Sequence, residues 1–266
     1  KAARAYTTFH MDAVTGRMSA TSAGINEPDR NMNNLPKKVE TGEVAPIRSM
    51  FIPDTGVWTL MDASQIELRI LAWFSRDQRM LNVFADPKGD IHRETQAGLS
   101  ALMQRTVSRE YAKGFNFAMV YGDDPGVVAA AVGTSDILGV MRIIKAWKEL
   151  YPDAARWMQL QRLQGMENLK VQTLFGRVIL LPIDQGDRHL QNCAVNFPIQ
   201  GSAAEIFKRQ ILAASKWAEW EKLPTHDEVA YDGDLMKELD TEAYANVSPV
   251  YTPVKLTRAR SLGEPE

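Results

Sequence analysis

The sequence has almost no cysteine and no long apolar run, and both absences narrow the class of protein. Its 266 residues include one cysteine, Cys193, so it can form neither an internal disulfide nor a cysteine-rich zinc site. The near absence of cysteine predicts a reducing, cytoplasmic location. No apolar run approaches the ~20 residues of a membrane span, so no membrane partner is expected.

The chain also lacks a basic excess. Lys and Arg number 31 against 33 Asp and Glu, which gives a formal net charge of −2. Any site for a polyanion must therefore be a local patch and not a field over the whole molecule. Hydrophobic residues make up 45% and charged residues 24%, as in ordinary globular proteins with a sizeable core.

Repeats and low-complexity tracts are absent too, and the remaining patterns indicate an α+β fold. The first 50 or so residues read as turns and extended segments. A β-like run, "GVWTLMD", precedes the helical "SQIELRILAWFS", and mostly helical patterns follow from 87 to 174. The later expected elements are a strand pair in "VQTLFGRVILLP", a long helix in "QGSAAEIFKRQILAASKWAEWEK", and strands in "THDEVAYD" and "TPVKLTRA". A sheet interrupted by a helical insertion is the prediction.

The segment "SREYAKGFNFAMVYG" places two cations and two aromatics at every fourth position: Arg109, Lys113, Phe117 and Tyr121. In a helix each such step drifts by only about 40°, so the four would form one stripe roughly 18 Å long. Cations suit phosphate oxygens, and an aromatic face suits a sugar or base. The alternative is a solvated cationic patch that runs into core aromatics.

Two acidic positions far apart in the sequence are candidates for chemistry. Asp62 ends a β-like run just before a helix, and Asp227 and Glu228 lie in "THDEVAYD". The plain alternatives are an acid that favours the helix macrodipole and an acidic hairpin turn. Ser64 and Glu67 have the spacing of a capping box, which would explain Glu67 without any chemistry.

Taken together, Asp62 and Asp227 predict a metal site more strongly than either residue does alone. Two carboxylates brought together by a sheet can hold two Mg²⁺ ions about 3.5–4 Å apart. Mg²⁺ binds few protein carboxylates and completes its shell with water and substrate phosphates, so two aspartates are enough. The cationic half of the stripe would then face the remaining phosphate charge.

The chain resembles the family A DNA polymerases, the DNA polymerase I type. In the family's order, "DASQIELR" is similar to motif A, "REYAKGFNFAMVYG" to motif B (the O helix), "NFPIQGSAAEIFK" to the segment along the primer–template, and "THDEV" to motif C. Supporting matches are "TGRMSA", "NNLP", "GDIHRET" and "TLFGR". The resemblance implies a right-hand fold with an antiparallel-sheet palm (1–86 and 186–266) and inserted helical fingers (87–185), lacking most or all of the thumb.

The resemblance also implies roles. The metal ligands would be Asp62, the backbone carbonyl of Ala63, and Asp227, with Mg²⁺ as cofactor and Mn²⁺ as a substitute. Glu228 would lie near the primer end, and Lys113 would share in catalysis. The nucleotide-binding residues would be Gln65, Glu67, His92, Arg109, Lys113, Phe117 and Tyr121. The DNA-binding residues would be Arg17, Asn33, Asn34, Gln200 and His226.

Several positions depart from the family pattern. Ala63 stands where Tyr is usual, and Glu110 and Asn192 each replace an arginine. No hydrophobic strand is visible before His226, where the sequence reads "EKLPT". Because the chain begins with Lys1 in what reads as mid-domain sequence, it is expected to be a fragment. The resemblance implies a bacterial or phage-infected host cell, and the absence of the family's thumb and exonuclease regions from this sequence is the basis for a phage origin.

The resemblance implies template-directed DNA synthesis, with primer–template DNA and deoxynucleoside triphosphates as partners. A thumb or exonuclease region would lie elsewhere in the chain or on another polypeptide. One rival is a single-subunit RNA polymerase, against which the identities of Glu67, Phe117 and Glu228 count. The other is a catalytically silent or thumb-dependent fragment that only binds DNA.

Overall fold

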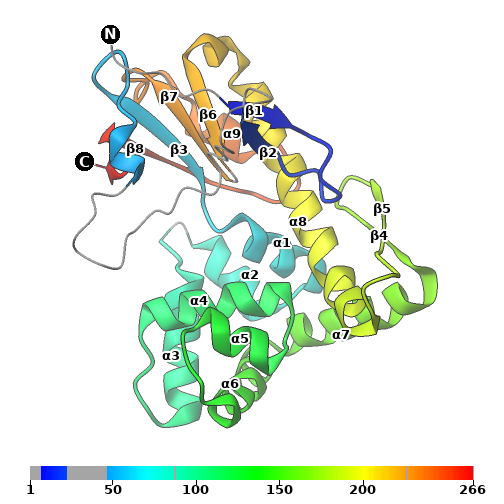
Figure 1. Cartoon of the computed structure of the whole chain (residues 1–266). Helices are drawn as coiled ribbons and strands as arrows, with labels where there is room; N and C mark the ends of the chain where they lie inside the picture. The colour runs from blue at the N-terminus through cyan, green and yellow to red at the C-terminus, as the bar shows by residue number, and fades with distance from the viewer. Residues whose placement is uncertain (1–6, 23–46, 87, 226, 266) are drawn as a thin grey trace. The chain divides into compact units, whose positions relative to one another are not determined.

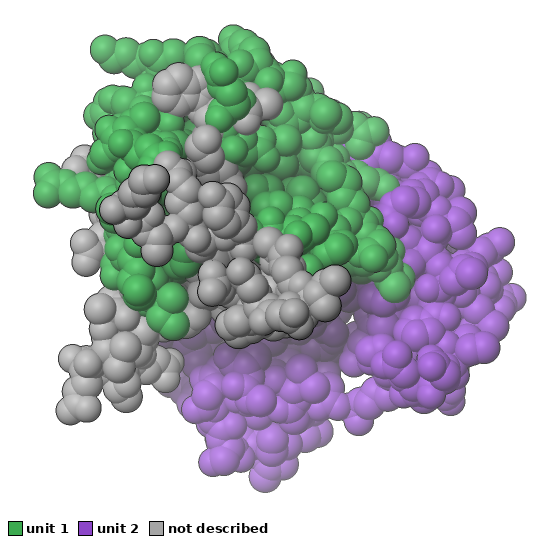
Figure 2. All heavy atoms as spheres, turned by 45° about the horizontal axis from the view of Figure 1, so that its top comes forward, with its two compact units in different colours: residues 1–66, 203–266 green, residues 67–202 purple. Residues whose placement is uncertain are grey.

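An antiparallel sheet and a separate group of helices are the main features of the computed structural model (Figure 1), which confirms the predicted α+β class. The structure describes residues 7–22, 47–86, 88–225 and 227–265. The chain divides into two compact units (Figure 2): a sheet unit, residues 1–66 and 203–266, and a helical unit, residues 67–202. None of the helices in the described part has the length and apolar character needed to span a bilayer.

A five-stranded sheet forms the centre of the sheet unit, with strand order β6-β7-β3-β8-β9 and antiparallel pairing throughout. The strands are β3 (Trp58–Ala63), β6 (Glu221–Thr225), β7 (Glu228–Asp232), β8 (Val254–Ser261) and β9 (Glu264–Pro265). The residues of β3 are buried except for Asp62, which is partly exposed. The strand is buried because it has neighbouring strands on both sides. A run of apolar residues is typical of such a central strand.

The central strand is anchored by apolar and polar contacts. Trp58 and Leu60 pack with Ala230 and Ala259 of the neighbouring strands. The intervening Thr59 hydroxyl donates to the Gly233 carbonyl at 2.6 Å and accepts from the backbone N–H of Leu235 at 2.9 Å. These contacts hold in place the strand that ends at the candidate acid. The remaining elements of this unit are β1 (Thr7–His10), β2 (Ser19–Ser22), η2 (Ile47–Met50), η3 (Ser215–Trp220) and α9 (Thr241–Ala245).

Helices dominate the helical unit, and several begin at an acid or a serine that accepts backbone N–H groups, as helix starts require. The helices are α1 (Ile66–Ser75), α2 (Gln78–Ala85), α3 (Ile91–Met103), α4 (Arg109–Tyr121), α5 (Pro125–Ala131), α6 (Ile137–Leu150), α7 (Pro152–Asn168) and α8 (Asp187–Ala213). The predicted strand pair is β4 (Lys170–Gln172) with β5 (Val178–Leu180). The division between the units falls within α8.

Two expectations near motif C were wrong. The long helix begins at Asp187, well before "QGSAAEIFK", contains Pro198, and ends at Ala213. The segment "EKLPT" is strand β6, paired with β7 from Glu221 to Thr225. Pro224 fits because β6 lies at the sheet edge, where one side of a strand needs no ladder donor.

The predicted palm–fingers boundaries, 86/87 and 185/186, differ from the divisions between the compact units at 66/67 and 202/203. The units record where packing is dense, whereas palm and fingers are functional terms, so the predicted domain limits stay predictions.

Candidate functional site

The sheet brings the candidate acids together at one end of β3 and β7. Asp62 lies directly opposite Glu228 in the antiparallel register, and the backbone N–H of Ala63 donates to the carbonyl of Asp227 at 2.8 Å. Directly opposed residues of antiparallel strands project from the same face. All three acids are partly exposed. The register therefore places Asp62 beside Glu228, and the backbone of Asp227 beside that of Ala63, although these residues are far apart in sequence.

Two cations flank this acidic pair. Lys255 on β8 is the register partner of Asp62 on its other side. Arg48, which is buried, approaches Glu228 with its Nη1 atom 3.6 Å from Oε1. Like charges placed opposite each other destabilise a sheet, and these cations offset that cost. Sequence reasoning missed both, because nothing in "APIRSM" or "TPVKL" links them to the acids.

The oxygen donors here suit a hard cation. Among the described residues, no three His, Cys, Asp or Glu side chains gather into a metal-binding group. Two carboxylates and a backbone carbonyl leave room for water and phosphate oxygens, which Mg²⁺ keeps readily and a closed protein cage would exclude. The donor set therefore fits Mg²⁺ shared with a substrate.

The start of α1 is determined by the backbone at Gln65. Gln65 has a left-handed φ of +55° and cannot be the first helical residue, so the helix begins at Ile66. Ser64 lies one residue too early to be the N-cap, and its N–H donates to the carbonyl of Pro253 at 3.0 Å. Glu67 is buried in the first turn of α1. The side-chain oxygen of Gln65 is buried without a hydrogen-bond partner in the described part of the chain.

Helix α4 carries the predicted stripe on its exposed side. Phe117 and Tyr121 are 36% and 40% exposed, and Lys113 is exposed. The opposite face, with Ala112, Phe115, Asn116, Ala118, Met119 and Val120, is buried. The aromatics of the stripe are therefore not core residues, and the packing-face alternative fails for them.

Arg109, at the start of the stripe, is held from behind by Asp90. The Nε atom of Arg109 donates to Oδ2 of Asp90 at 2.8 Å. Asp90 also caps α3 by accepting from the backbone N–H groups of His92 and Arg93. Burial alone would raise the pKa of Asp90, yet the bonds from Arg109 and the backbone lower it overall. The carboxylate thus stays charged while it orients the guanidinium.

His92 lies beneath the stripe, with its ring centroid 5.8 Å from that of Phe117. It is buried, and its Nδ1 atom is 3.1 Å from Nδ2 of Asn116. Burial lowers the pKa of His92 to about 4; the cations Arg109 and Lys113 add to this, and Asp90 opposes it. His92 is therefore neutral at neutral pH.

The last turn of α4 ends in a tightly constrained loop. Gly122 has φ +137°, and a Cβ there would lie 2.5 Å from Oδ1 of Asn192. The Tyr121 hydroxyl accepts from Nε2 of Gln200 at 3.5 Å, so two of the predicted contact residues meet in this unit.

Ion pairs hold the chain just after that loop. Asp123 pairs with Lys148 and, at 2.7 Å, with Arg162. Asp124 pairs with Arg188 at 2.5 Å. Burial tends to raise the pKa of Asp123, but the hydrogen bond from Lys148 and the charge of Arg162 lower it overall. This cluster attaches the end of the stripe to α6, α7 and α8.

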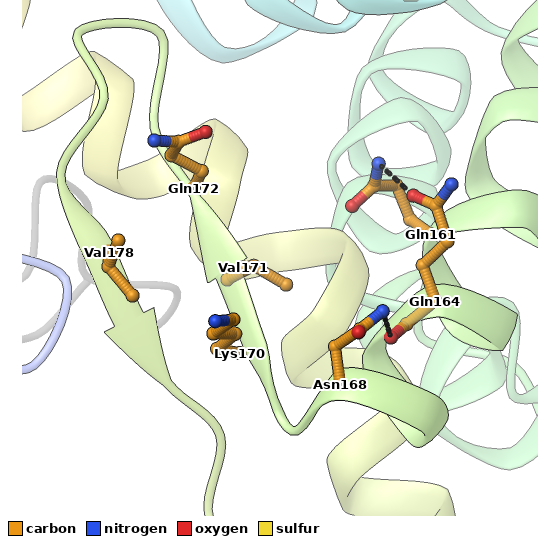
Figure 3. Close-up of a pocket in the computed structure, with 7 residues that line it drawn as sticks. All are labelled: Gln161, Gln164, Asn168, Lys170, Val171, Gln172 and Val178. Carbon is orange, nitrogen blue, oxygen red and sulfur yellow. Dashed lines mark hydrogen bonds between the residues drawn. The ribbon is translucent and has the colours of Figure 1, made fainter.

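The remaining predicted residues are spread over the chain. Arg17 is partly buried in the sheet unit, while Asn33, Asn34 and His226 lie outside the described residues. The candidate metal ligands belong to the sheet unit and the stripe to the helical unit. A pocket of about 430 Å³ in the helical unit (Figure 3) contains none of the predicted residues, and its lining is Gln161, Gln164, Asn168, Lys170, Val171, Gln172 and Val178.

Residues 1–248 match the family model of DNA polymerase family A. The chain belongs to this family. It is 33% identical over 231 residues to DNA polymerase I of Pseudomonas aeruginosa, an alignment that covers 81% of the chain and 24% of the relative. With the thermostable DNA polymerase I of Thermus aquaticus it shares 28% identity over 95% of the chain and 31% of the relative. The chain thus spans about a quarter to a third of these curated relatives.

A solved structure gives the same assignment. The POL domain of Pol1 from M. smegmatis, in complex with DNA primer-template and dNTP, matches with a TM-score of 0.79 and 26% identity. The match covers 98% of this chain and 48% of that one. The fold class predicted from the sequence agrees with this similarity.

Proposed function

We propose that the protein carries out template-directed DNA synthesis, adding deoxynucleotides to a primer 3′-hydroxyl with release of pyrophosphate. The observation that carries the proposal is the exposed row of two cations and two aromatics on α4, in a member of a DNA polymerase family. A helix face that offers charge first and ring faces afterwards matches a triphosphate followed by a sugar and a base.

In this proposal Asp62, Asp227 and the carbonyl of Ala63 hold two Mg²⁺ ions, for which Mn²⁺ can substitute. When bound, such ions lower the pKa of an attacking hydroxyl and stabilise the leaving oxygen. These residues would hold the ions at the end of the paired strands, where the backbone of Ala63 is bonded to that of Asp227 and Asp62 lies beside Glu228. Glu228 lies near the primer end.

Arg109 and Lys113 bind the phosphates, with Asp90 fixing the direction of the Arg109 guanidinium. A prepositioned cation stabilises charge that develops during reaction without having to reorganise. Phe117 packs on the sugar of the nucleotide, and Tyr121 faces the templating base. Gln65 and Glu67 line the sugar site, where Glu67 excludes a 2′-hydroxyl.

Primer–template DNA is the proposed polymeric partner, contacted by Arg17 and Gln200 and by Asn33, Asn34 and His226. Because the net charge of the chain is −2, its binding to DNA depends on locally clustered cations. The affinity for DNA should therefore fall as the salt concentration rises. A thumb or exonuclease region belongs to another part of the chain or to another polypeptide.

Primer extension with Mg²⁺ and deoxynucleotides tests the proposal. Wild-type chain should extend a primer, and Asp227→Asn should abolish extension while primer–template affinity stays near the wild-type value. Asp234→Asn is the matched control, because Asp234 pairs with Arg258 on the same unit away from the acids. If the wild-type chain binds DNA but never extends it, the proposal fails and a silent or thumb-dependent binding fragment replaces it.

A further inference from the structure

A buried chain of side-chain hydrogen bonds lies under the stripe of α4. Its central residue is Asn116, which is fully buried and joins α4 to α3 and α6. Asn116 contacts the indole of Trp147, the hydroxyl of Thr95 and the ring of His92. Each of these partners is also buried, so solvent cannot substitute for any of them.

The chemistry of Trp147 determines how the amide of Asn116 is turned. An indole Nε1–H can only donate, so the atom 2.9 Å away must be the acceptor of the amide, Oδ1. The amide nitrogen Nδ2 then faces Oγ1 of Thr95 at 2.9 Å and Nδ1 of His92 at 3.1 Å. Nδ2 has two hydrogens and can supply both contacts.

The orientation of the amide in turn determines the tautomer of His92. Because Nδ2 of Asn116 only donates, Nδ1 of His92 must accept, and the single proton of the neutral ring lies on Nε2. Thr95 completes the pattern, since its hydroxyl donates to the Ile91 carbonyl at 2.8 Å and can accept from Asn116. We propose that Asn116 is a positioning residue which, oriented by Trp147, fixes His92 as the neutral Nε2–H tautomer.

The next step rests on the proposed function. With its proton on Nε2, His92 is a neutral hydrogen-bond donor in the nucleotide site and not a third cation. Its charged neighbours are Asp90 on one side and Arg109, Glu110 and Lys113 on α4. The lowered pKa of His92 keeps the ring neutral among them. Nucleotide affinity should therefore not depend on His92 titration between about pH 5 and 8.

Nitrogen NMR of the whole chain tests the tautomer without any activity measurement. The sequence contains four histidines, so His92→Gln assigns the resonances of interest. Two-bond nitrogen–proton couplings should show His92 as Nε2–H. Asn116→Asp replaces the donor by an acceptor of the same shape, and at pH 7.5 should move the single ring proton to Nδ1. Thr95→Val, which leaves the Asn116–His92 contact in place, should keep the Nε2–H form.

A second variant guards against failure of Asn116→Asp to fold. Trp147→Phe removes the donor that orients the amide, so His92 should become a mixture of both tautomers while α-helical circular dichroism is retained. An Nδ1–H tautomer in wild type, or an unchanged Nε2–H tautomer in both Asn116→Asp and Trp147→Phe, would overturn the proposal.

Kinetics then separates this inference from the proposed function. At pH 7.5 Asn116→Asp should raise the nucleotide KM roughly tenfold, the effect of losing one hydrogen bond to a charged acceptor. The KM should recover at lower pH as the altered ring gains a proton, whereas the wild-type profile stays flat. If the tautomer changes as expected and KM does not, the inference about Asn116 stands and His92 is removed from the nucleotide site.

Discussion

In the sheet unit, main-chain hydrogen bonds hold the candidate acids, whereas in the helical unit side-chain hydrogen bonds hold the candidate nucleotide-binding residues. The carboxylate of Asp62 is placed by a strand paired on both sides. The guanidinium of Arg109 is placed by the carboxylate of Asp90, and the ring of His92 by Asn116. The sheet unit thus positions its candidate residues through the backbone, and the helical unit positions its candidate residues through other side chains.

The difference predicts different costs of substitution. A side chain at the end of a ladder can be replaced without loss of the ladder, because the backbone bonds remain. A side chain within a buried hydrogen-bond network cannot be replaced without a loss of stability, because its removal leaves a buried partner without a hydrogen bond. Substitutions in the sheet unit should therefore separate activity from stability more cleanly than those beneath the stripe.

The largest expected effect is at Asp62. Asp62→Asn keeps the size and the strand register but removes the charge that would hold metal in the proposed site, so extension should fall by on the order of a thousandfold or more. The melting temperature should stay within about 2 °C of wild type, since Asp62 is partly exposed and the backbone pairing of its strand is kept. A variant that unfolds more easily and loses activity only in proportion would show that Asp62 is structural.

Lys113 tests the exposed side of the other unit. Lys113→Ala should lower kcat/KM for nucleotide by about a hundredfold, the size of a lost contact to developing charge, with unchanged stability. Lys145→Ala, at another exposed lysine in the helical unit, is the matched control and should leave kcat/KM unaltered. Equal kinetics for the two variants would remove Lys113 from the nucleotide site.

The buried His92 of the helical unit should make the stability of the protein depend on pH. Unfolded His92 takes up its proton near its ordinary pKa of 6.5, and the folded residue only near about 4. Stability should therefore be complete above about pH 6.5 and decline by on the order of 3 kcal/mol as the pH falls to about 4. Urea unfolding across this range measures it.

Two glutamine variants separate His92 from the other titrating groups. His92→Gln should flatten this part of the pH profile, whereas His189→Gln, at an exposed position, should leave it unchanged. A decline of the same size in all three proteins would assign the effect to other groups.

The smallest expected effect concerns sugar choice at Glu67. The removal of a buried side chain that excludes a 2′-hydroxyl should raise ribonucleotide use at least about tenfold, or ~1.4 kcal/mol in differential transition-state binding. Glu67→Ala should show this, and Glu67→Gln, which keeps the volume, should retain more discrimination. The measurement is kcat/KM for matched ribo- and deoxynucleotides, and a constant ratio with lowered stability would make Glu67 a packing residue only.

Much of the fold was predictable because its signals are local. The apolar run at β3, the strand pair β4–β5 and the four-residue spacing along α4 each lie within one short window, and periodicity reveals such patterns. β6 was not predictable, because "EKLPT" has no strand pattern and owes its conformation to pairing with β7. Long-range pairing overrides local propensity in this way.

Part of the candidate site could be proposed from the sequence for the same reason. Asp62, Asp227 and the stripe stand in motifs that can be read from sequence. Their supports cannot, because Asp90 and Asn116 lie 19 and 24 residues from the partners they hold, Arg109 and His92. Motif B contains Asn116, but only the contact with Trp147 shows what its amide does.

The close approach of Gly122 to Asn192 has a consequence for related sequences. With no space for a Cβ at Gly122 and a φ that side chains rarely adopt, this position is closed to other residues while Asn192 keeps its place. Tyr121, one residue earlier and 40% exposed, has no such limit on its size. Because its φ disfavours any side chain whatever residue stands at position 192, position 122 should be glycine in every relative that shares this loop, whereas position 121 should vary in size.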